Sequence, residues 1–152
     1  MKKKYFTIVA IFLCCQNFQA QAQAQSRIPT IVTNGVIEAP SGSSLSKGVD
    51  ISSSRKEVFS ISEGTVVSSF TKDGLQTVLV KCAGSIYVYG NMATVLVSSG
   101  DVLKEGQKIG DLSRKEDDQY SLHFEAWKAT SQNPVLLSYT DTKKVLNING
   151  PN

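Results

Sequence analysis

The stretch that decides the fold is SSGDVLKEGQKIGDL, residues 98–112. It carries two apolar anchors seven residues apart, Val102 and Ile109. Gly106 stands between them at a tight turn, and Gly110 closes the unit. Glycine is favoured where the backbone takes a positive φ or passes close to another strand. The stretch therefore predicts a strand–turn–strand unit of the kind found in small sandwiched β-barrels.

Further short apolar runs lie on both sides of this stretch. Runs of strand length, rich in Val, Ile, Tyr and Phe and separated by Gly-containing turns at intervals of about 8–12 residues, are typical of antiparallel β-proteins. No stretch of about 11 residues or more keeps the apolar spacing of a helix. We therefore predict an all-β fold, a small antiparallel β-sandwich or barrel-sandwich hybrid. The predicted strands are residues 58–61, 65–70, 77–82, 85–89, 108–112 and 122–127.

Composition divides the rest of the chain. Residues 25–46 are rich in Ser, Gly, Pro and Thr, which predicts an extended lead-in with one strand near residues 30–37. Residues 47–140 hold the strand pattern and form the predicted domain. Residues 141–152 are interpreted as a C-terminal tail.

The N-terminus has the order of a secretory signal. A positive segment, Lys2 to Lys4, precedes an apolar run, Tyr5 to Cys15, and an Ala-x-Ala cleavage site follows. We predict a signal peptide over residues 1–24 and an exported protein of the periplasm or cell envelope. The apolar run is shorter than the roughly 20 residues of a membrane span, so no transmembrane segment is expected in the mature chain. An uncleaved anchor, or a lipoprotein cleaved before Cys14 or Cys15, stays as an alternative.

Charge and cysteine content exclude some classes. Sixteen Lys and Arg residues against thirteen Asp and Glu give +3, and removal of Lys2, Lys3 and Lys4 leaves thirteen of each sign. A neutral mature chain lacks the basic surface that nucleic acid requires, so no nucleic-acid partner is expected. Cys82 is the one cysteine beyond the signal. It lies in an apolar alternating run, so we interpret it as a small buried side chain.

Four segments, taken in order, resemble the lysostaphin/LytM-type zinc endopeptidases, which hydrolyse peptide cross-links of the bacterial cell wall. SKGVDI resembles the family's His-x-Gly-x-Asp-Ile motif, and SIYVYGNM resembles its Tyr-x-His-Leu segment. SLHFE resembles its His-x-His-Phe-Glu motif. VLKEGQKIG, which is part of the strand–turn–strand unit described above, is the remaining segment of the resemblance. The segments are residues 46–51, 85–92, 121–125 and 102–110. The resemblance implies a LytM-type fold over about residues 47–139.

The resemblance also implies where a zinc ion would bind. In the family the three protein ligands are the first-motif histidine, its aspartate and the second histidine of His-x-His. The matching positions hold Ser46, Asp50 and His123. A serine hydroxyl is a poor zinc ligand beside imidazole. Asp50 and His123 are thus either a residual metal site or a hydrogen-bonded polar pair, and we expect no cofactor, with zinc below full occupancy.

Two further family histidines, which orient the attacking water and steady the oxyanion, are also replaced. Their positions hold Asn91 and Ser121. Loss of one acid–base group costs about 10²–10⁴ in rate, so the sequence predicts a degenerate, inactive domain. The resemblance places Ser46, Tyr89, Asn91 and Ser121 around a binding groove. Glu125 is interpreted as outward polar alternation or as a partner of His123.

Two aromatic residues of the predicted strands can be interpreted either as ligand-binding or as structural residues. Trp127 and Tyr87 have the residue type of glycan-stacking platforms, but their alternation within strands favours core or cross-strand pairs.

Three hypotheses for function follow. The first is an exported, inactive LytM-like domain that binds peptidoglycan peptide or an envelope protein such as a cell-wall amidase, as a binding or hydrolase-regulating module. The second is an active zinc metalloendopeptidase with substituted ligands, cleaving peptidoglycan cross-links. The third is a structural subunit of an envelope assembly.

Overall fold

The computed structural model describes residues 31–39 and 48–146 of the 152-residue chain. The predicted signal peptide, Ser46 and most of the predicted lead-in lie outside these residues. Within them the chain forms ten strands and one short helix. The elements are β1 Val36–Ile37, β2 Val49–Ser53, β3 Glu57–Phe59, β4 Gly64–Lys72, β5 Leu75–Cys82, β6 Ser85–Val95, β7 Val102–Leu103, β8 Lys108–Leu112, β9 Tyr120–Lys128, β10 Val135–Leu136 and α1 Tyr139–Val145.

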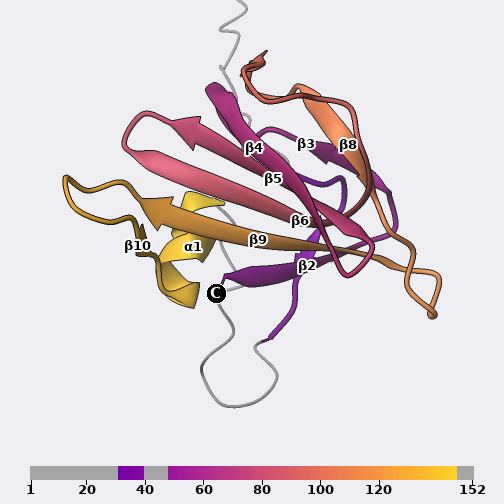
Figure 1. Cartoon of the computed structure of the whole chain (residues 1–152). Coiled ribbons are helices and arrows are strands. Elements are labelled where there is room, and N and C mark those ends of the chain that lie inside the picture. The colour runs from indigo at the N-terminus through magenta and orange to yellow at the C-terminus, as the bar shows by residue number, and fades with distance from the viewer. Residues whose placement is uncertain (1–30, 40–47, 147–152) are drawn as a thin grey trace, which may run out of the picture.

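The strands form one antiparallel sheet. Its order is β1-β2-β9-β6-β5-β4-β7, while β10 pairs with β9, and β8 pairs with both β3 and β6. Figure 1 shows the long strands β9, β6, β5 and β4 side by side. Each predicted strand run overlaps an observed strand, and the prediction of an all-β antiparallel fold is confirmed.

The strand–turn–strand unit of residues 98–112 has the glycine geometry that its sequence predicts. Gly106 takes a φ of 75°, and a Cβ on Gly110 would lie 2.2 Å from the carbonyl oxygen of Thr94. Of the two predicted apolar anchors, Ile109 is buried, but the prediction is wrong for Val102. Val102 is 76% exposed, whereas Leu103 is 1% exposed and packs in the core with Ile109. Val102 pairs with Thr65 on β4, and strand alternation then turns Leu103 inward.

Strand alternation divides β6 and β9 into two faces. Tyr89, Phe124 and Ala126 are buried in one hydrophobic cluster. Their sequence neighbours point to the opposite side, which we call the outer face. On this face Gly90 lies across from His123, Val88 from Glu125, and Ile86 from Trp127. The register of β6 and β9 therefore gathers polar and apolar side chains of distant sequence onto one surface.

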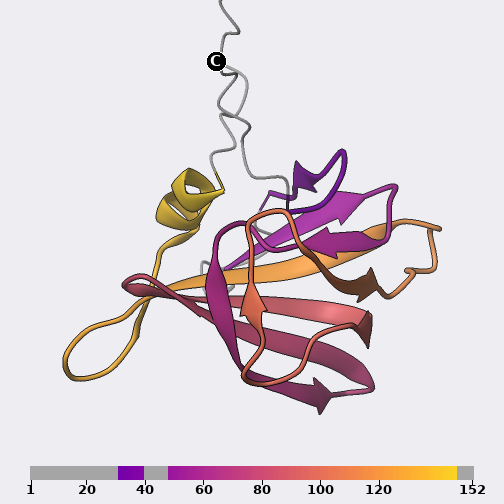
Figure 2. The ribbon, with the colours of Figure 1, turned by 90° about the horizontal axis from the view of Figure 1, so that it is seen from above.

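The packed unit extends beyond the predicted domain at both ends. Ile31 and Val32 of the predicted lead-in are buried, and the strand expected near residues 30–37 is limited to Val36–Ile37. Residues 139–145, which span the end of the predicted domain and the start of the predicted tail, form helix α1. Ser138 caps this helix, because its side chain accepts a hydrogen bond from the Asp141 amide. Leu146 after the helix is 1% exposed. Figure 2 shows α1 beside the end of β9.

Helix α1, the sole helix among residues 31–39 and 48–146, is too short to cross a membrane.

Replacement of Leu146 by Ala tests whether the C-terminal segment is part of the core. Leu146→Ala should lower the free energy of unfolding by about 2–5 kcal/mol, because it removes a fully buried side chain. The matched control is Leu96→Ala, since Leu96 is 62% exposed and its truncation should cost less than about 0.5 kcal/mol. Urea unfolding of the two variants measures both values. Equal stability of the two variants would contradict the packing of residue 146 in the core.

Candidate functional site

Strands β2 and β9 bring together two residues that lie 73 positions apart in the chain. Asp50 and His123 are direct partners in the β2–β9 register. The Nδ1 atom of His123 lies 2.8 Å from Oδ1 of Asp50. Both side chains are partly exposed on the outer face, at 44% for Asp50 and 32% for His123. The first and last motifs of the sequence therefore meet in space.

A second carboxylate holds the other side of the imidazole ring. Oε1 of Glu125 lies 3.3 Å from Nε2 of His123. The indole Nε1 of Trp127 donates a hydrogen bond of 2.7 Å to Oε2 of the same carboxylate. Since His123, Glu125 and Trp127 alternate along β9, they share the outer face. The interpretation of Glu125 as a partner of His123 agrees with this contact.

The two carboxylates favour the charged form of the ring. The hydrogen bond to Asp50, followed by the one to Glu125, raises the pKa of His123 from 6.5 to about 9, against the opposing effect of burial. The hydrogen bond to His123 in turn lowers the pKa of Asp50. An imidazolium with a carboxylate at each nitrogen is a stable arrangement, because each charge has a partner of opposite sign.

The described residues do not fit a zinc site. A catalytic zinc needs three protein ligands whose lone pairs converge on one point. Asp50 and Glu125 instead approach opposite nitrogens of the His123 ring, so each nitrogen already has a carboxylate partner where a metal ion would bind. Within residues 31–39 and 48–146, no three His, Cys, Asp or Glu side chains come together to hold a metal ion. Ser46 lies outside the described residues.

Two residues predicted to line the groove are buried instead. Tyr89 has no exposed surface, its ring packs edge-on against Phe124 at 5.4 Å, and its hydroxyl accepts a hydrogen bond from the Ile61 amide. Its position in β6 faces the core, so the prediction that Tyr89 borders the groove is wrong. Ser121 shares the face of His123 by strand alternation, but it is 4% exposed, so its predicted place in an open groove is wrong.

Asn91 keeps a partly exposed position. It follows Gly90, has a φ of 63°, and its carbonyl accepts a hydrogen bond of 3.0 Å from the Ser113 amide. Asparagine tolerates this left-handed backbone better than most residues. Asn91 therefore has a local structural role where β6 turns toward β8.

Cys82 is half-buried, and its Sγ accepts a hydrogen bond of 3.0 Å from the Ser62 hydroxyl. Burial raises the pKa of this thiol, so it lacks the thiolate character of a catalytic cysteine.

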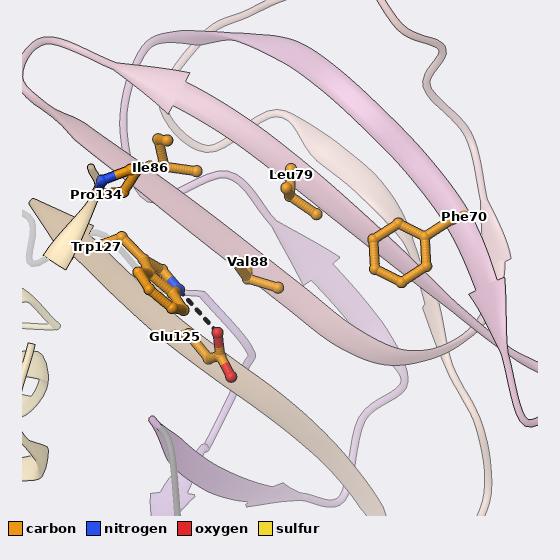
Figure 3. A pocket seen from close by; sticks show the side chains of 7 residues that line it. All are labelled: Phe70, Leu79, Ile86, Val88, Glu125, Trp127 and Pro134. Atoms are coloured by element: carbon orange, nitrogen blue, oxygen red, sulfur yellow. Dashed lines mark hydrogen bonds between the residues drawn. The ribbon is translucent and has the colours of Figure 1, made fainter. Parts of the chain in front are cut away.

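An apolar pocket on the outer face was not predicted from the sequence. Figure 3 shows its side chains, with Phe70 at one end and Trp127 and Pro134 at the other. The cavity volume is about 330 Å³, and the lining residues are Phe70, Leu79, Ile86, Val88, Glu125, Trp127 and Pro134. Trp127 is indeed a cross-strand neighbour, of Ile86, but it lines this open pocket rather than the core. Tyr87 packs against Phe124 at 5.6 Å, as its alternation predicts.

Comparisons with known proteins agree on the fold. The profile described as "Peptidase family M23" matches residues 44–135. A chain from the crystal structure of the SpoIIIAH and SpoIIQ complex is 30% identical, with 67% of this chain and 74% of that chain covered and a TM-score of 0.53. A chain of the SpoIIQ–SpoIIIAH pore-forming complex gives 28% identity, 70% coverage of each chain and a TM-score of 0.53.

More distant structures share the fold alone. They include a mutant of the catalytic domain of the prophage-encoded M23 protein EnpA from Enterococcus faecalis, at 21% identity, with 72% of this chain and 92% of that chain covered and a TM-score of 0.55. The antimicrobial peptidase lysostaphin from Staphylococcus simulans is 20% identical, with 78% of this chain and 54% of that chain covered and a TM-score of 0.61. No curated protein sequence gives a significant match.

The charge state of His123 can be measured directly, because it is the one histidine of the sequence. After dialysis against a chelator, an NMR titration of its ring protons should give a pKa of about 9. Asp50→Asn should move this pKa down toward the ordinary 6.5, since it removes the largest cause of the shift. Asp118→Asn, at an exposed carboxylate that pairs with Arg114, is the control and should leave it unchanged.

The same shift sets the sign of a pH effect on stability. Because the folded pKa is raised, the contribution of the His123 ion pairs is complete below about 6.5 and is lost as pH rises through about 9. A titration midpoint near 6.5 in the unchanged protein would contradict the two-carboxylate geometry.

Proposed function

The chain belongs to peptidase family M23, and from this premise we propose that it is an M23 domain that binds a cell-envelope ligand without hydrolysing it. The observation that carries the proposal is the His123 ring, which lies between the carboxylates of Asp50 and Glu125. The side chain that the family resemblance assigns to zinc is engaged at both nitrogens by the protein itself. The site therefore has the chemistry of a salt-bridged surface and not of a Lewis acid.

The remaining substitutions support the same proposal. Hydrolysis of a peptide bond needs groups that take up and release a proton near neutral pH. Asn91 and Ser121 have no such group, and Ser121 is buried as well. Ser46 stands where the resemblance places the first histidine ligand. Each of these changes removes a part of the hydrolytic machinery, while the sheet that forms the outer face is intact.

The N-terminal sequence supports an envelope location, and two of the similar structures support a protein partner. Lys2 to Lys4, the apolar run and the Ala-x-Ala site have the order of a secretory signal. The SpoIIQ–SpoIIIAH structures are complexes of two different proteins. By this likeness we propose an envelope protein or a peptidoglycan peptide as the partner, with a cell-wall amidase as one example of a regulated hydrolase.

Zinc analysis tests the loss of the metal site. The purified mature protein, equilibrated with zinc and dialysed, should retain far less than one zinc per chain by elemental analysis, because Ser46 replaces a histidine ligand and both nitrogens of His123 have carboxylate partners. The triple variant Ser46→His, Asn91→His, Ser121→His measured alongside should retain more. A ratio near one zinc per chain in the unchanged protein would contradict the proposal and favour the endopeptidase hypothesis.

Hydrolysis assays test the absence of activity. The mature protein with added zinc should release no new amino groups from purified peptidoglycan or from pentaglycine peptides, since a metal ligand and two acid–base groups are replaced together. An active M23 peptidase in the same assay shows that the substrates can be cleaved. Zinc-dependent cleavage by the unchanged protein that chelation abolishes would overturn the proposal.

A further inference from the structure

We propose that the outer-face pocket binds a bulky apolar side chain of an extended protein segment that carries Lys or Arg two residues from this anchor. The inference rests on the proposed binding function and names the class of its ligand. It favours a protein segment as the ligand over a peptidoglycan peptide, whose side chains are small.

The size of the pocket favours a large side chain. Its volume of about 330 Å³ is at the lower end of ligand pockets, which span roughly 300–1,000 Å³. A Gly or Ala residue of a cell-wall cross-link offers at most one methyl group and leaves most of this volume unfilled. A Leu, Phe or Trp side chain makes contacts on several walls, and dispersion gains grow with the number of such contacts.

The walls have the composition of an anchor site. Leu79 and Val88 are cross-strand partners on the floor, and Phe70 is 47% exposed at one end. Figure 3 shows Trp127 across from this apolar row, with its indole fixed by the hydrogen bond to Glu125. Because that bond satisfies the indole N–H, the ring presents an apolar surface to the pocket. In protein interfaces, a few aromatic anchors in desolvated pockets of this kind carry most of the binding energy.

Charge complementarity assigns the cation and its position. The charges of Asp50, His123 and Glu125 sum to −1 when the imidazole is protonated and to −2 when it is neutral. The end of the pocket that lies toward Asp50 and His123 is therefore negative in either state. Lys115 is the nearby cation that acts on Asp50, but it pairs with Glu38 at 3.4 Å. Asp50 is 44% exposed and accessible to a ligand.

The opposite end of the pocket has the opposite charge. Lys81 is in register with Ile86 and is exposed there. A cation of the ligand is therefore favoured at the Asp50 end and disfavoured at the Lys81 end. His123 stands two residues from Glu125 along β9, a distance of about 7 Å. An extended segment lying along β9 with its anchor beside Glu125 thus places a residue two positions away next to Asp50 and His123.

A selection from a random peptide library on the mature protein tests this inference. Enriched peptides should carry Leu, Phe or Trp with Lys or Arg two residues away. Binding of the strongest peptide should change the fluorescence of Trp127, the one tryptophan of the chain. Phe70→Ala should weaken its affinity about tenfold or more, measured by calorimetry. Leu96→Ala, which truncates an exposed residue outside the pocket, is the control and should bind as the unchanged protein does.

A double-mutant cycle tests the cation. Asp50→Asn should lower the affinity for the peptide that carries Lys but leave the affinity for its Lys→Ala counterpart unchanged. Circular dichroism confirms the fold of each variant. Enriched peptides without a bulky apolar residue, or full affinity in Phe70→Ala, would overturn the inference. Binding of soluble peptidoglycan fragments with no enriched peptide would also overturn it, while leaving the proposed binding function in place. Failure of the proposed function is separate, because it would show as zinc-dependent hydrolysis.

Discussion

Strand β9 lies between β2 and β6, and the register of these two pairings is the constraint on which the site depends. On one side it places His123 opposite Asp50, and on the other it places Glu125 and Trp127 opposite Val88 and Ile86. The alternate residues Leu122, Phe124 and Ala126 are fully buried. A shift by one residue would exchange the two faces, which would bury charge and expose the core. The hydrophobic effect that forms the core therefore also assembles the outer face.

The imidazole of His123 has become part of an ion network. A metal ligand must keep one nitrogen free, and partners of the other nitrogen normally orient the ring toward the metal. Here both nitrogens have carboxylate partners, and the second carboxylate also holds Trp127 in place. The same contacts that occupy the ring thus fix the indole wall of the apolar pocket. In the proposed function, one set of contacts both occupies the His123 ring and shapes the binding surface.

The sequence predicted the sheet well because strand alternation and glycine turns are local signals. Gly106 and Gly110 have the positive φ and the close approach that their positions indicate. The burial of Leu103 in place of Val102 depends on pairing with β4, which no local pattern encodes. The family resemblance predicts that Asp50 and His123 lie together, but the inward position of Tyr89 follows from its register with Phe124. The apolar pocket draws residues from β4, β5, β6 and β9, so it exists only once the sheet has formed.

A crystal structure of the mature protein soaked in zinc tests the central claim most directly, through anomalous scattering at the zinc edge. The account predicts no anomalous peak beside His123, with Asp50 and Glu125 still within hydrogen-bond distance of the two ring nitrogens. A zinc peak about 2.0–2.1 Å from a ring nitrogen of His123, with one carboxylate displaced, would contradict it.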